Sequence, residues 1–306
     1  MRISLLYASW INYGEKWNSP LGFEQELRLR GHEVKHFNLY HRDGAIRQYS
    51  NEGLNQLHAD IRNGYQPDVI MLFDYGVFDA AQLDRSTYKD AIWIMESGDD
   101  YQAFSRNSQK AHKFDIVVTP DYRCMEVYRA NNINAYWWNH CCDTNIYFPE
   151  SEIQPIYNVV TTSGPRGKGL TEKLSEVFGE QFNNQRFFYG RDHAQRLQLG
   201  KLVFQCSQFG EISRRIFEGI GCKRAVITDR LSPIRHLEDL FKDGEDIILY
   251  STFDECIEKI KYYSEHDSER ERIALNGYNK VISEHSVSVR VDQLEDYIEE
   301  FKVKRD

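Results

Sequence analysis

The chain has 306 residues, of which 41% are hydrophobic and 28% are charged, and this composition predicts a globular protein with one large domain or two of ordinary size. Its formal net charge of −9 argues against a general attraction to nucleic acid or anionic membrane, although a local basic cleft stays compatible with it. No apolar run approaches the ~20 residues that a membrane-spanning helix needs.

Strands and helices alternate through the first half of the chain. Residues 2–8 predict a buried strand, and a loop with Gly14 leads to a helix that starts at Ser19 and Pro20 and stops at Gly31. Further strands are predicted at 32–39, 68–73, 91–96, 114–119 and 135–139, and further helices at 51–63 and 121–131. This order is typical of a parallel, doubly wound sheet, so a complete Rossmann-like domain is expected here.

A second α/β series follows a predicted linker. The linker is residues 149–158, which contain two prolines and two acidic residues. Beyond it we predict strands at 158–163, 186–190, 201–206, 225–229 and 246–250, helices at 170–178 and 212–220, and a helical tail from about Asp254 to Lys304. We therefore expect an α/β protein with two Rossmann-like domains that face one another across a cleft.

The six cysteines predict neither disulfides nor a zinc site. Cys141 and Cys142 are adjacent and cannot bridge without strain, and no C-x-x-C pair or suitable Cys/His spacing occurs. The start, MRISLLYASW, becomes polar too quickly for a signal peptide. A reducing, cytoplasmic compartment is the expected location.

The most informative segment lies between Leu202 and Asp229, where a strand, a turn, a helix, a glycine stop and a second strand follow one another. The carboxylate of Glu218 can accept two hydrogen bonds from a vicinal diol, while two arginines and the helix start can bind a diphosphate. The alternative is an ordinary i,i+4 surface pair between Arg214 and Glu218. The donor-binding candidates here are Gly210, Ser213, Arg214, Arg215 and Glu218.

A glycine-rich basic loop, SGPRGKG at residues 163–169, follows a predicted strand and precedes a predicted helix. Its glycines, Gly164 among them, permit close approach of the backbone, and Arg166 and Lys168 can neutralise a diphosphate leaving group. The spacing is not that of a Walker motif. A solvated basic loop is the alternative interpretation.

Candidates for the acceptor side lie mainly in the first half. Asp99 and Asp100, in ESGDDYQ, can orient an acceptor hydroxyl or remove its proton, and the alternative is a helix N-cap followed by a first-turn acid. The adjacent pair lacks the D-x-D spacing of a metal-bound nucleotide site, so no metal is implied. The other acceptor-side candidates are Tyr13, Gly14, Lys16, Trp17 and His140, with packing roles open for Trp17 and His140.

These residues resemble a known family. The stretch RRIFEGIGCKRAVITD resembles the R-x-F-E-(small)-x-(small)-C/G segment of the CgeB-like, spore maturation protein type glycosyltransferases, within the group-1 glycosyltransferases. The closing segment is similar to that family's G-…-H-(S/T)-x-x-x-R-x-x-x-L pattern, with Gly277, His285 and Arg290. The similarity begins at about residue 91 and is strongest from 210 to 294.

The resemblance implies a GT-B fold, a UDP- or GDP-type sugar donor, no bound cofactor and no obligatory metal. It gives Glu218 the place of the family's ribose-binding glutamate. Related enzymes usually have E-x7-E, whereas six residues separate Glu211 from Glu218, so Glu211 is not carried over as a sugar-contacting acid. The expected domains are 1–150 on the acceptor side, 151–285 for the nucleotide-sugar, and a closing helix at 286–306 that returns to the first domain.

The function predicted from the sequence is transfer of a hexosyl or pentosyl group to a hydroxyl, without a metal and with retention of configuration. The catalytic candidates are Asp99, Asp100, Arg166 and Lys168. The acceptor can be a glycan, a protein, a metabolite or a modified DNA base, the last of these making the chain a phage-type DNA-modifying enzyme. The competing class is a non-catalytic nucleotide-sugar-binding protein on the same fold, and an epimerase would need a cluster of acids and a histidine that the sequence does not assemble.

Overall fold

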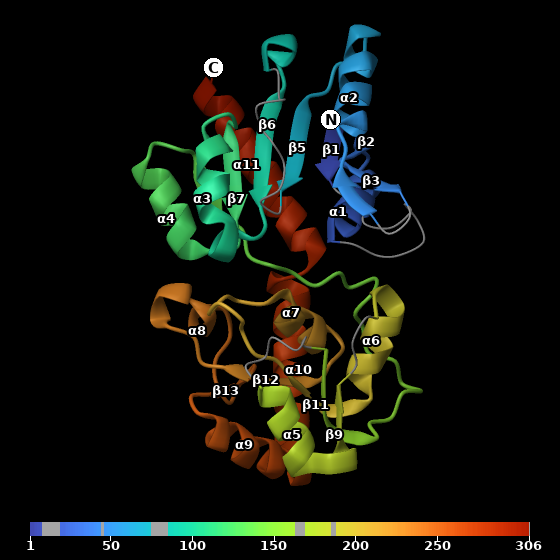
Figure 1. The fold of residues 1–306 in the computed structure, drawn as a ribbon, viewed down its shortest axis with the longest axis vertical. Coiled ribbons are helices and arrows are strands. Elements are labelled where there is room, and N and C mark those ends of the chain that lie inside the picture. The colour runs from blue at the N-terminus through green and yellow to red at the C-terminus, as the bar shows by residue number, and fades with distance from the viewer. Residues whose placement is uncertain (8–18, 44–45, 75–84, 163–168, 185–187, 306) are drawn as a thin grey trace. The chain divides into compact units, whose positions relative to one another are not determined.

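The computed structural model describes residues 1–7, 19–43, 46–74, 85–162, 169–184 and 188–305 (Figure 1). The chain forms two compact units. Unit 1 comprises Met1–Asn139 and Arg290–Asp306, and unit 2 comprises His140–Val289. The boundaries between the units in the sequence fall at 139/140 and 289/290, whereas the sequence analysis expects them at 150/151 and 285/286.

Unit 1 is built on a six-stranded parallel sheet with the order β2-β1-β5-β6-β7-β8. Its strands are β1 (Arg2–Tyr7), β2 (Glu33–Asn38), β5 (Val69–Asp74), β6 (Ile92–Ser97), β7 (Ile116–Thr119) and β8 (Ala135–Trp137). All six strands predicted in the first half are confirmed. The central strand β6 is buried along its whole length, as expected of a parallel strand covered on both faces.

Helices cover both faces of this sheet (Figure 1). The helices of unit 1 are α1 (Ser19–Leu29), α2 (Glu52–Arg62), η2 (Arg85–Tyr88), α3 (Asp100–Ala111), α4 (Tyr122–Ala130) and, from Arg290 onward, α11 (Val287–Arg305). Leu72 and Phe73 are consecutive in β5, so their side chains point to opposite faces. Leu72 joins the core that α2, α3 and α4 cover, whereas the ring of Phe73 lies 5.7 Å from that of Phe23 in α1.

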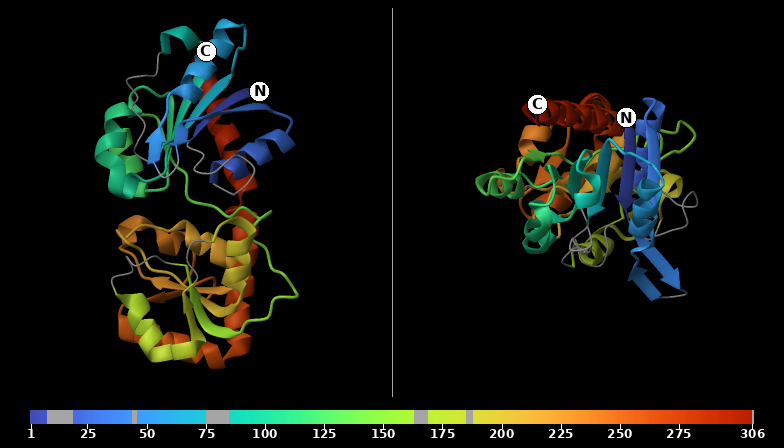
Figure 2. Two further views of the ribbon diagram at one scale, coloured as in Figure 1. Left: turned by 45° about the vertical axis from the view of Figure 1, so that its right-hand side comes forward. Right: turned by 90° about the horizontal axis from the view of Figure 1, so that it is seen from above.

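A short antiparallel hairpin follows β2. Its strands are β3 (Tyr40–Asp43) and β4 (Ile46–Tyr49), and their register pairs Tyr40 with Tyr49. Figure 2 shows this hairpin as a separate blue ribbon beside the main sheet of unit 1. The sequence analysis predicts no strand here, although Asp-Gly at 43–44 is a hairpin turn signal.

Helix α11 completes unit 1. Arg290 Nε donates to the carbonyl oxygen of Asn139 at 2.8 Å, and the indole nitrogen of Trp138 donates to the carbonyl oxygen of Arg290 at 3.0 Å. The rings of Tyr136 and Tyr297 stack with centroids 3.9 Å apart. The prediction that the closing helix returns to the first domain is therefore confirmed.

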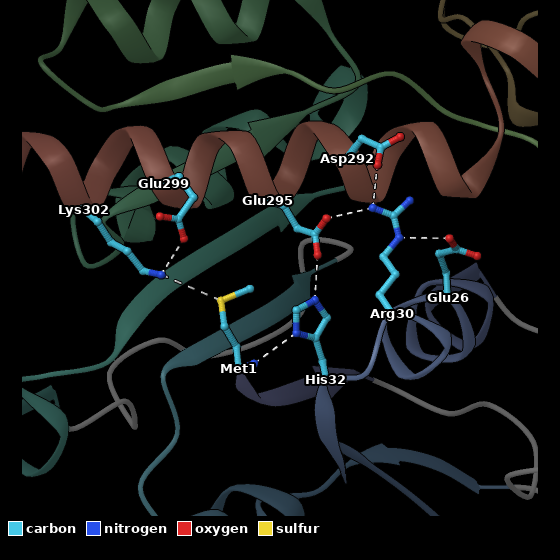
Figure 3. Close-up of polar contacts among 8 residues, drawn as sticks. All are labelled: Met1, Glu26, Arg30, His32, Asp292, Glu295, Glu299 and Lys302. Carbon is cyan, nitrogen blue, oxygen red and sulfur yellow. Dashed lines mark hydrogen bonds and ion pairs between the residues drawn. The ribbon is translucent and has the colours of Figure 1, made fainter.

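Charged side chains also join α11 to the end of α1 and the start of β2 (Figure 3). Arg30 Nη1 lies 2.5 Å from Asp292 Oδ1 and 2.7 Å from Glu295 Oε2. Its Nε donates to Glu26 Oε1 at 3.0 Å, and His32 Nε2 lies 2.6 Å from Glu295 Oε1. One guanidinium thus contacts three carboxylates from two helices.

Replacing Arg30 with methionine is expected to lower the free energy of unfolding by about 1–2 kcal/mol, because the guanidinium is only 21% exposed and serves a network rather than a single pair. Urea denaturation measures this loss. The matched control is Lys302→Met, which removes a pair with Glu299 whose members are 40% and 65% exposed, and it is expected to change stability by less than about 0.5 kcal/mol. Equal effects of the two substitutions would contradict the prediction.

Unit 2 is built on a five-stranded parallel sheet with the order β10-β9-β11-β12-β13. Its strands are β9 (Tyr157–Thr161), β10 (Phe182–Asn184), β11 (Gly200–Phe204), β12 (Ala225–Asp229) and β13 (Ile248–Tyr250). The strands predicted at 158–163, 201–206, 225–229 and 246–250 are confirmed. The strand predicted at 186–190 is wrong at its end, because Gly190, with φ +56°, begins a helix; residues 186–187 lie outside the described residues.

Helices cover both faces of this second sheet as well. They are α5 (Leu170–Phe178), η3 (Gly179–Gln181), α6 (Gly190–Gln198), α7 (Arg214–Gly221), η4 (Pro233–Arg235), α8 (Leu237–Leu240), α9 (Phe253–Glu265) and α10 (Asp267–Glu284). The predicted helices at 170–178 and 212–220 and the helical tail are confirmed, whereas α6 and α8 were not predicted. Leu202 of β11 faces the core covered by α5 and α9, and the next residue, Val203, faces α7.

The segment predicted to be a linker, residues 149–158, lies within unit 2. The backbone N–H of Glu150 donates to Gln198 Oε1 at 2.7 Å, and Arg224 Nη2 lies 3.4 Å from the carbonyl oxygen of Ile153. The linker prediction is wrong because this proline-containing segment is hydrogen-bonded along the side of unit 2. Within the described ranges, no helix combines the length and the apolar character that crossing a membrane requires.

Candidate functional site

The strand order of unit 2 reverses between β9 and β11, because β10 lies on one side of β9 and β11 on the other. Ligands of such sheets bind beyond the carboxyl ends of the strands at this switch point. The segments that follow β9 and β11 therefore flank the candidate site. The predicted phosphate loop, with Gly164, Arg166 and Lys168, follows β9, but residues 163–168 lie outside the described residues.

The loop after β11 is closed by one of its own side chains. Glu211 Oε2 accepts from the backbone N–H groups of Gln208 at 3.1 Å and Phe209 at 2.6 Å. Gly210 has φ +73°, a conformation that residues with a Cβ rarely adopt. Glu211 is thus occupied by the loop backbone, which agrees with leaving it out of the sugar-contacting residues.

Helix α7 begins at Arg214, and the residue before it, Ser213, caps its start. Ser213 has extended backbone angles, and its hydroxyl oxygen accepts from the N–H of Arg215 at 3.3 Å, which makes it the N-cap. Arg214 is half-buried and Arg215 is exposed. The helix start therefore brings two guanidinium groups to the carboxyl edge of the sheet, where the sequence analysis places the diphosphate.

Two glycines let α7 lie close to its neighbours. A Cβ on Gly219 would lie 2.8 Å from Val226 Cγ2, and a Cβ on Gly221 would lie 2.3 Å from Cys142 Sγ. Both distances are shorter than packed carbon or sulfur atoms tolerate. The small residues of the R-x-F-E-(small)-x-(small)-C motif are therefore required by packing, and they determine how deeply Glu218 sits in unit 2.

Glu218 is a buried carboxylate with open acceptor capacity. Its side chain is 7% exposed, and its Oε2 lies 3.8 Å from His193 Nδ1. It accepts no hydrogen bond from any residue that the structure describes. The alternative of an ordinary surface pair with Arg214 is wrong, because the carboxylate is not at the surface. Its oxygens are not among the fully buried side-chain atoms that lack a partner, so they stay accessible to a ligand that supplies donors.

Two neutral side chains lie beside Glu218. Tyr147 Oη lies 2.9 Å from His193 Nδ1, and the two rings meet edge to face with centroids 5.6 Å apart. Burial lowers the pKa of His193, although the charge of Glu218 acts to raise it. Burial and the charge of Glu218 raise the pKa of Tyr147 well above its ordinary value. The sequence analysis missed both residues, and the only signal for His193 was the helical pattern of residues 191–198.

The two adjacent aspartates of unit 1 have different environments. Asp100 is 1% exposed, and its Oδ1 accepts from Asn107 Nδ2 at 2.9 Å and from the Tyr128 hydroxyl at 3.1 Å. Asp99 is half-exposed at the N-cap position of α3, where its Oδ1 accepts from the Tyr101 hydroxyl at 2.8 Å. Of the pair, only Asp99 is therefore accessible to an acceptor, and Asp100 belongs to a buried polar network.

The stability of the Asp100→Asn variant relative to wild type is expected to increase as the pH rises. Burial raises the pKa of Asp100, against hydrogen bonds from Ser97 and Asn107 that lower it. Because the folded-state pKa exceeds the unfolded one of ~3.9, this group's stabilisation is fully present below that unfolded value and is lost as the pH rises through the folded-state pKa. The Tm of Asp100→Asn minus the Tm of wild type, both measured by calorimetry, should therefore increase from pH 4 to pH 7.

The control for changes at the start of α3 is Asp99→Asn at the neighbouring position. A Tm difference for Asp100→Asn that stays constant or falls with pH would contradict the buried, proton-binding role of Asp100.

The remaining acceptor-side candidates are not brought together by the described part of the structure. Tyr13, Gly14, Lys16 and Trp17 lie outside the described residues. His140 is half-buried and is the first residue of unit 2. In the described ranges, no group of three or more His, Cys, Asp or Glu side chains is arranged to hold a metal ion.

Comparison with known proteins bears on both units. A family model described as glycosyl transferase-like matches residues 164–296, which include β11, α7 and Glu218. No curated protein matches the chain by sequence. Sucrose-phosphate synthase from Thermosynechococcus elongatus is similar in structure, with a TM-score of 0.68 and 11% identity over 96% of this chain and 98% of that one. The chain has the GT-B fold.

Other proteins with this fold were solved with ligands. Anabaena HepE in complex with UDP-glucose has a TM-score of 0.69 and 14% identity, over 98% of this chain and all of that chain. An α-glucosyltransferase in complex with UDP and a 13-mer DNA containing an HMU base has a TM-score of 0.64 and 11% identity, over 97% of this chain and 99% of that chain. The predicted GT-B fold is confirmed, and the family match supports a glycosyltransferase.

Proposed function

We propose that the protein is a glycosyltransferase that moves a sugar from a nucleoside-diphosphate sugar to a hydroxyl acceptor. The observation that carries this proposal is the buried carboxylate of Glu218, which accepts no hydrogen bond from the described residues and lies on the helix that follows the switch-point strand. A ribose diol supplies two donors to such a carboxylate. The CgeB-like resemblance and the glycosyl transferase-like match at 164–296 support the same assignment.

The diphosphate is bound in this proposal by cationic groups around the switch point. Arg214 and Arg215 occupy the first turn of α7, where the helix dipole also favours an anion. The loop that follows β9 in sequence contributes Arg166 and Lys168 as further cations and Gly164 for close backbone approach. These groups stabilise the charge that develops on the leaving diphosphate, which is the work that a metal ion does in other enzymes. We therefore propose a metal-independent reaction with a uridine or guanosine diphosphate donor.

The acceptor side is assigned to the first domain. Asp99 is the candidate there for orienting the acceptor hydroxyl, together with Tyr13, Gly14, Lys16, Trp17 and, at the junction, His140. Asp100 lies in a buried polar network with Asn107 and Tyr128 and is not proposed to contact the acceptor. With retention of configuration no dedicated base is required, and Asp99 orients the acceptor; with inversion it takes the proton.

Turnover of nucleotide-sugars by pure protein tests the proposal. The protein is incubated with UDP- and GDP-sugars, each with and without EDTA, and release of free nucleoside diphosphate is measured, with NMR of the product anomer to assign the stereochemistry. Release that survives EDTA and is lost in Glu218→Ala is the expected result. Binding of these sugars without any release, even with a broad set of hydroxyl acceptors, would instead identify a non-catalytic binding protein.

A modified base in DNA is a second acceptor class. The similarity in fold to the α-glucosyltransferase that was solved with HMU-containing DNA motivates it, while the net charge of −9 argues against it. Sugar incorporation into duplex DNA with hydroxymethylated pyrimidines, compared with unmodified duplex, separates this acceptor from glycan, protein and metabolite acceptors.

A further inference from the structure

Three side chains from separate segments of unit 2 meet at the proposed donor site. Tyr147 comes from the segment before β9, His193 from α6 and Glu218 from α7. His193 Nδ1 is common to both contacts, at 2.9 Å from Tyr147 Oη and 3.8 Å from Glu218 Oε2. All three residues are less than 10% exposed, so the arrangement belongs to the interior and is not an incidental surface contact.

The charge of Glu218 selects the tautomer of His193. A neutral imidazole carries its proton on one nitrogen only, and a lone pair on Nδ1 would face the carboxylate unfavourably. The proton is therefore favoured on Nδ1, which donates it to Tyr147 Oη and itself lies 3.8 Å from Glu218 Oε2. At 3.8 Å the contact with Glu218 is electrostatic attraction rather than a hydrogen bond.

Such a contact orients the carboxylate without using its acceptor capacity. A glutamate side chain has several rotatable bonds, and binding two hydroxyls of one diol requires both oxygens in one orientation. Helix α7 is fixed by the close packing of Gly219 and Gly221, so the helix sets the Cα position of Glu218 while His193 attracts one of its oxygens. The remaining lone pairs stay open to a ligand.

We propose that His193, held in place by Tyr147, is a positioning residue that orients Glu218 and thereby sets the preference of the donor site for a nucleotide with an intact ribose diol; this rests on the proposed function. His193 does not itself touch the nucleotide. Its contribution appears only for ligands that have the diol, because a nucleotide without those hydroxyls makes no use of the orientation of Glu218.

The experiment compares UDP with 2′,3′-dideoxy-UDP by isothermal titration calorimetry, with the corresponding guanosine pair used in the same way. The matched variants are His193→Asn, whose amide nitrogen takes the place of Nδ1, and His193→Gln, whose amide nitrogen takes the place of Nε2. Wild type is expected to bind UDP roughly 30-fold or more tightly than the dideoxy compound. His193→Asn should keep this ratio within about threefold, and His193→Gln should reduce it about tenfold with unchanged affinity for the dideoxy nucleotide.

The outcomes separate the two proposals. Failure of wild-type protein to bind either nucleotide pair would overturn the donor site itself. A ribose preference that is lost in Glu218→Ala but retained in His193→Gln would overturn only the positioning role. If His193→Gln does not fold, as judged by thermal melting, Tyr147→Phe provides the test: it keeps the ring and removes the hydroxyl, and a wild-type ratio in this variant would equally overturn the proposal.

Discussion

Replacing Glu218 with alanine is expected to weaken the binding of UDP by about 100-fold, because two charge-assisted hydrogen bonds to the ribose are lost at about 1.5–3 kcal/mol each and part of this is recovered by water. Glutamine keeps one acceptor oxygen and should show a smaller loss. Isothermal titration calorimetry with UDP measures both. The matched control is Glu258→Ala, an exposed glutamate on α9 of the same unit, for which the affinity should not change.

The glutamine substitution at position 218 leads to a second prediction, which concerns the protein without ligand. Glu218 is 7% exposed and accepts no hydrogen bond from the described residues, so glutamine at this position breaks no hydrogen bond that the described residues make. Thermal unfolding of ligand-free Glu218→Gln should therefore occur at the wild-type temperature or above it. If Glu218 only stabilised the fold, its replacement would lower the Tm. A lower Tm together with unchanged UDP affinity would remove the basis for the donor site.

A methyl group at position 221 is expected to lower the free energy of unfolding by about 2 kcal/mol. Alanine gains up to about 1 kcal/mol of helix propensity over glycine, but its Cβ would lie 2.3 Å from Cys142 Sγ, and relieving that overlap costs more. Urea denaturation of Gly221→Ala measures the net effect. Because Cys142 precedes Tyr147 in the same segment, the displaced sulfur should also disturb the contact between Tyr147 and His193.

A second substitution identifies the cause. Cys142→Ala removes the sulfur, and in that background the effect of Gly221→Ala should fall close to zero. The carbonyl oxygen of Tyr147 at 3.2 Å and its Cβ at 3.4 Å then stay as close neighbours of the added methyl group. The control is Gly219→Ala, whose Cβ would meet Val226 and Val203 instead and which Cys142→Ala should not rescue. Additive effects of Gly221→Ala and Cys142→Ala would show that the clash is not the reason for the glycine.

The sequence predicted the sheets of both units well because their strands are short apolar runs with turn signals on either side. Strand β6, IWIMES, and strand β12, AVITD, are almost wholly buried, and such runs carry a strong signal without tertiary information. The edge strand β10, FNN, has no such signal, because an edge needs little apolar surface. The aromatic run before Gly190 suggested a strand there, where the chain turns into α6 instead.

Sequence patterns can relate only those candidate site residues that lie within one segment. Glu218, its arginines and the N-cap Ser213 lie within one helix and its cap, so their relation follows from helical spacing alone. His193 and Tyr147 reach Glu218 from two other segments, and no local pattern shows that three segments converge on one atom. The different environments of Asp99 and Asp100 also depend on tertiary packing, because neighbouring residues on a helix start point in different directions.

Unit 1 draws on both ends of the chain, with Met1–Asn139 and Arg290–Asp306 on either side of the whole of unit 2. During synthesis on the ribosome, the first sheet is therefore made long before the helix that covers Trp138 on one of its faces. Until α11 emerges, the aromatic and aliphatic side chains on that face stay open to chaperones or to aggregation. Unit 2 is continuous in sequence, so it can reach its native state first, and slow translation near residue 290 should affect the solubility of unit 1 more than that of unit 2.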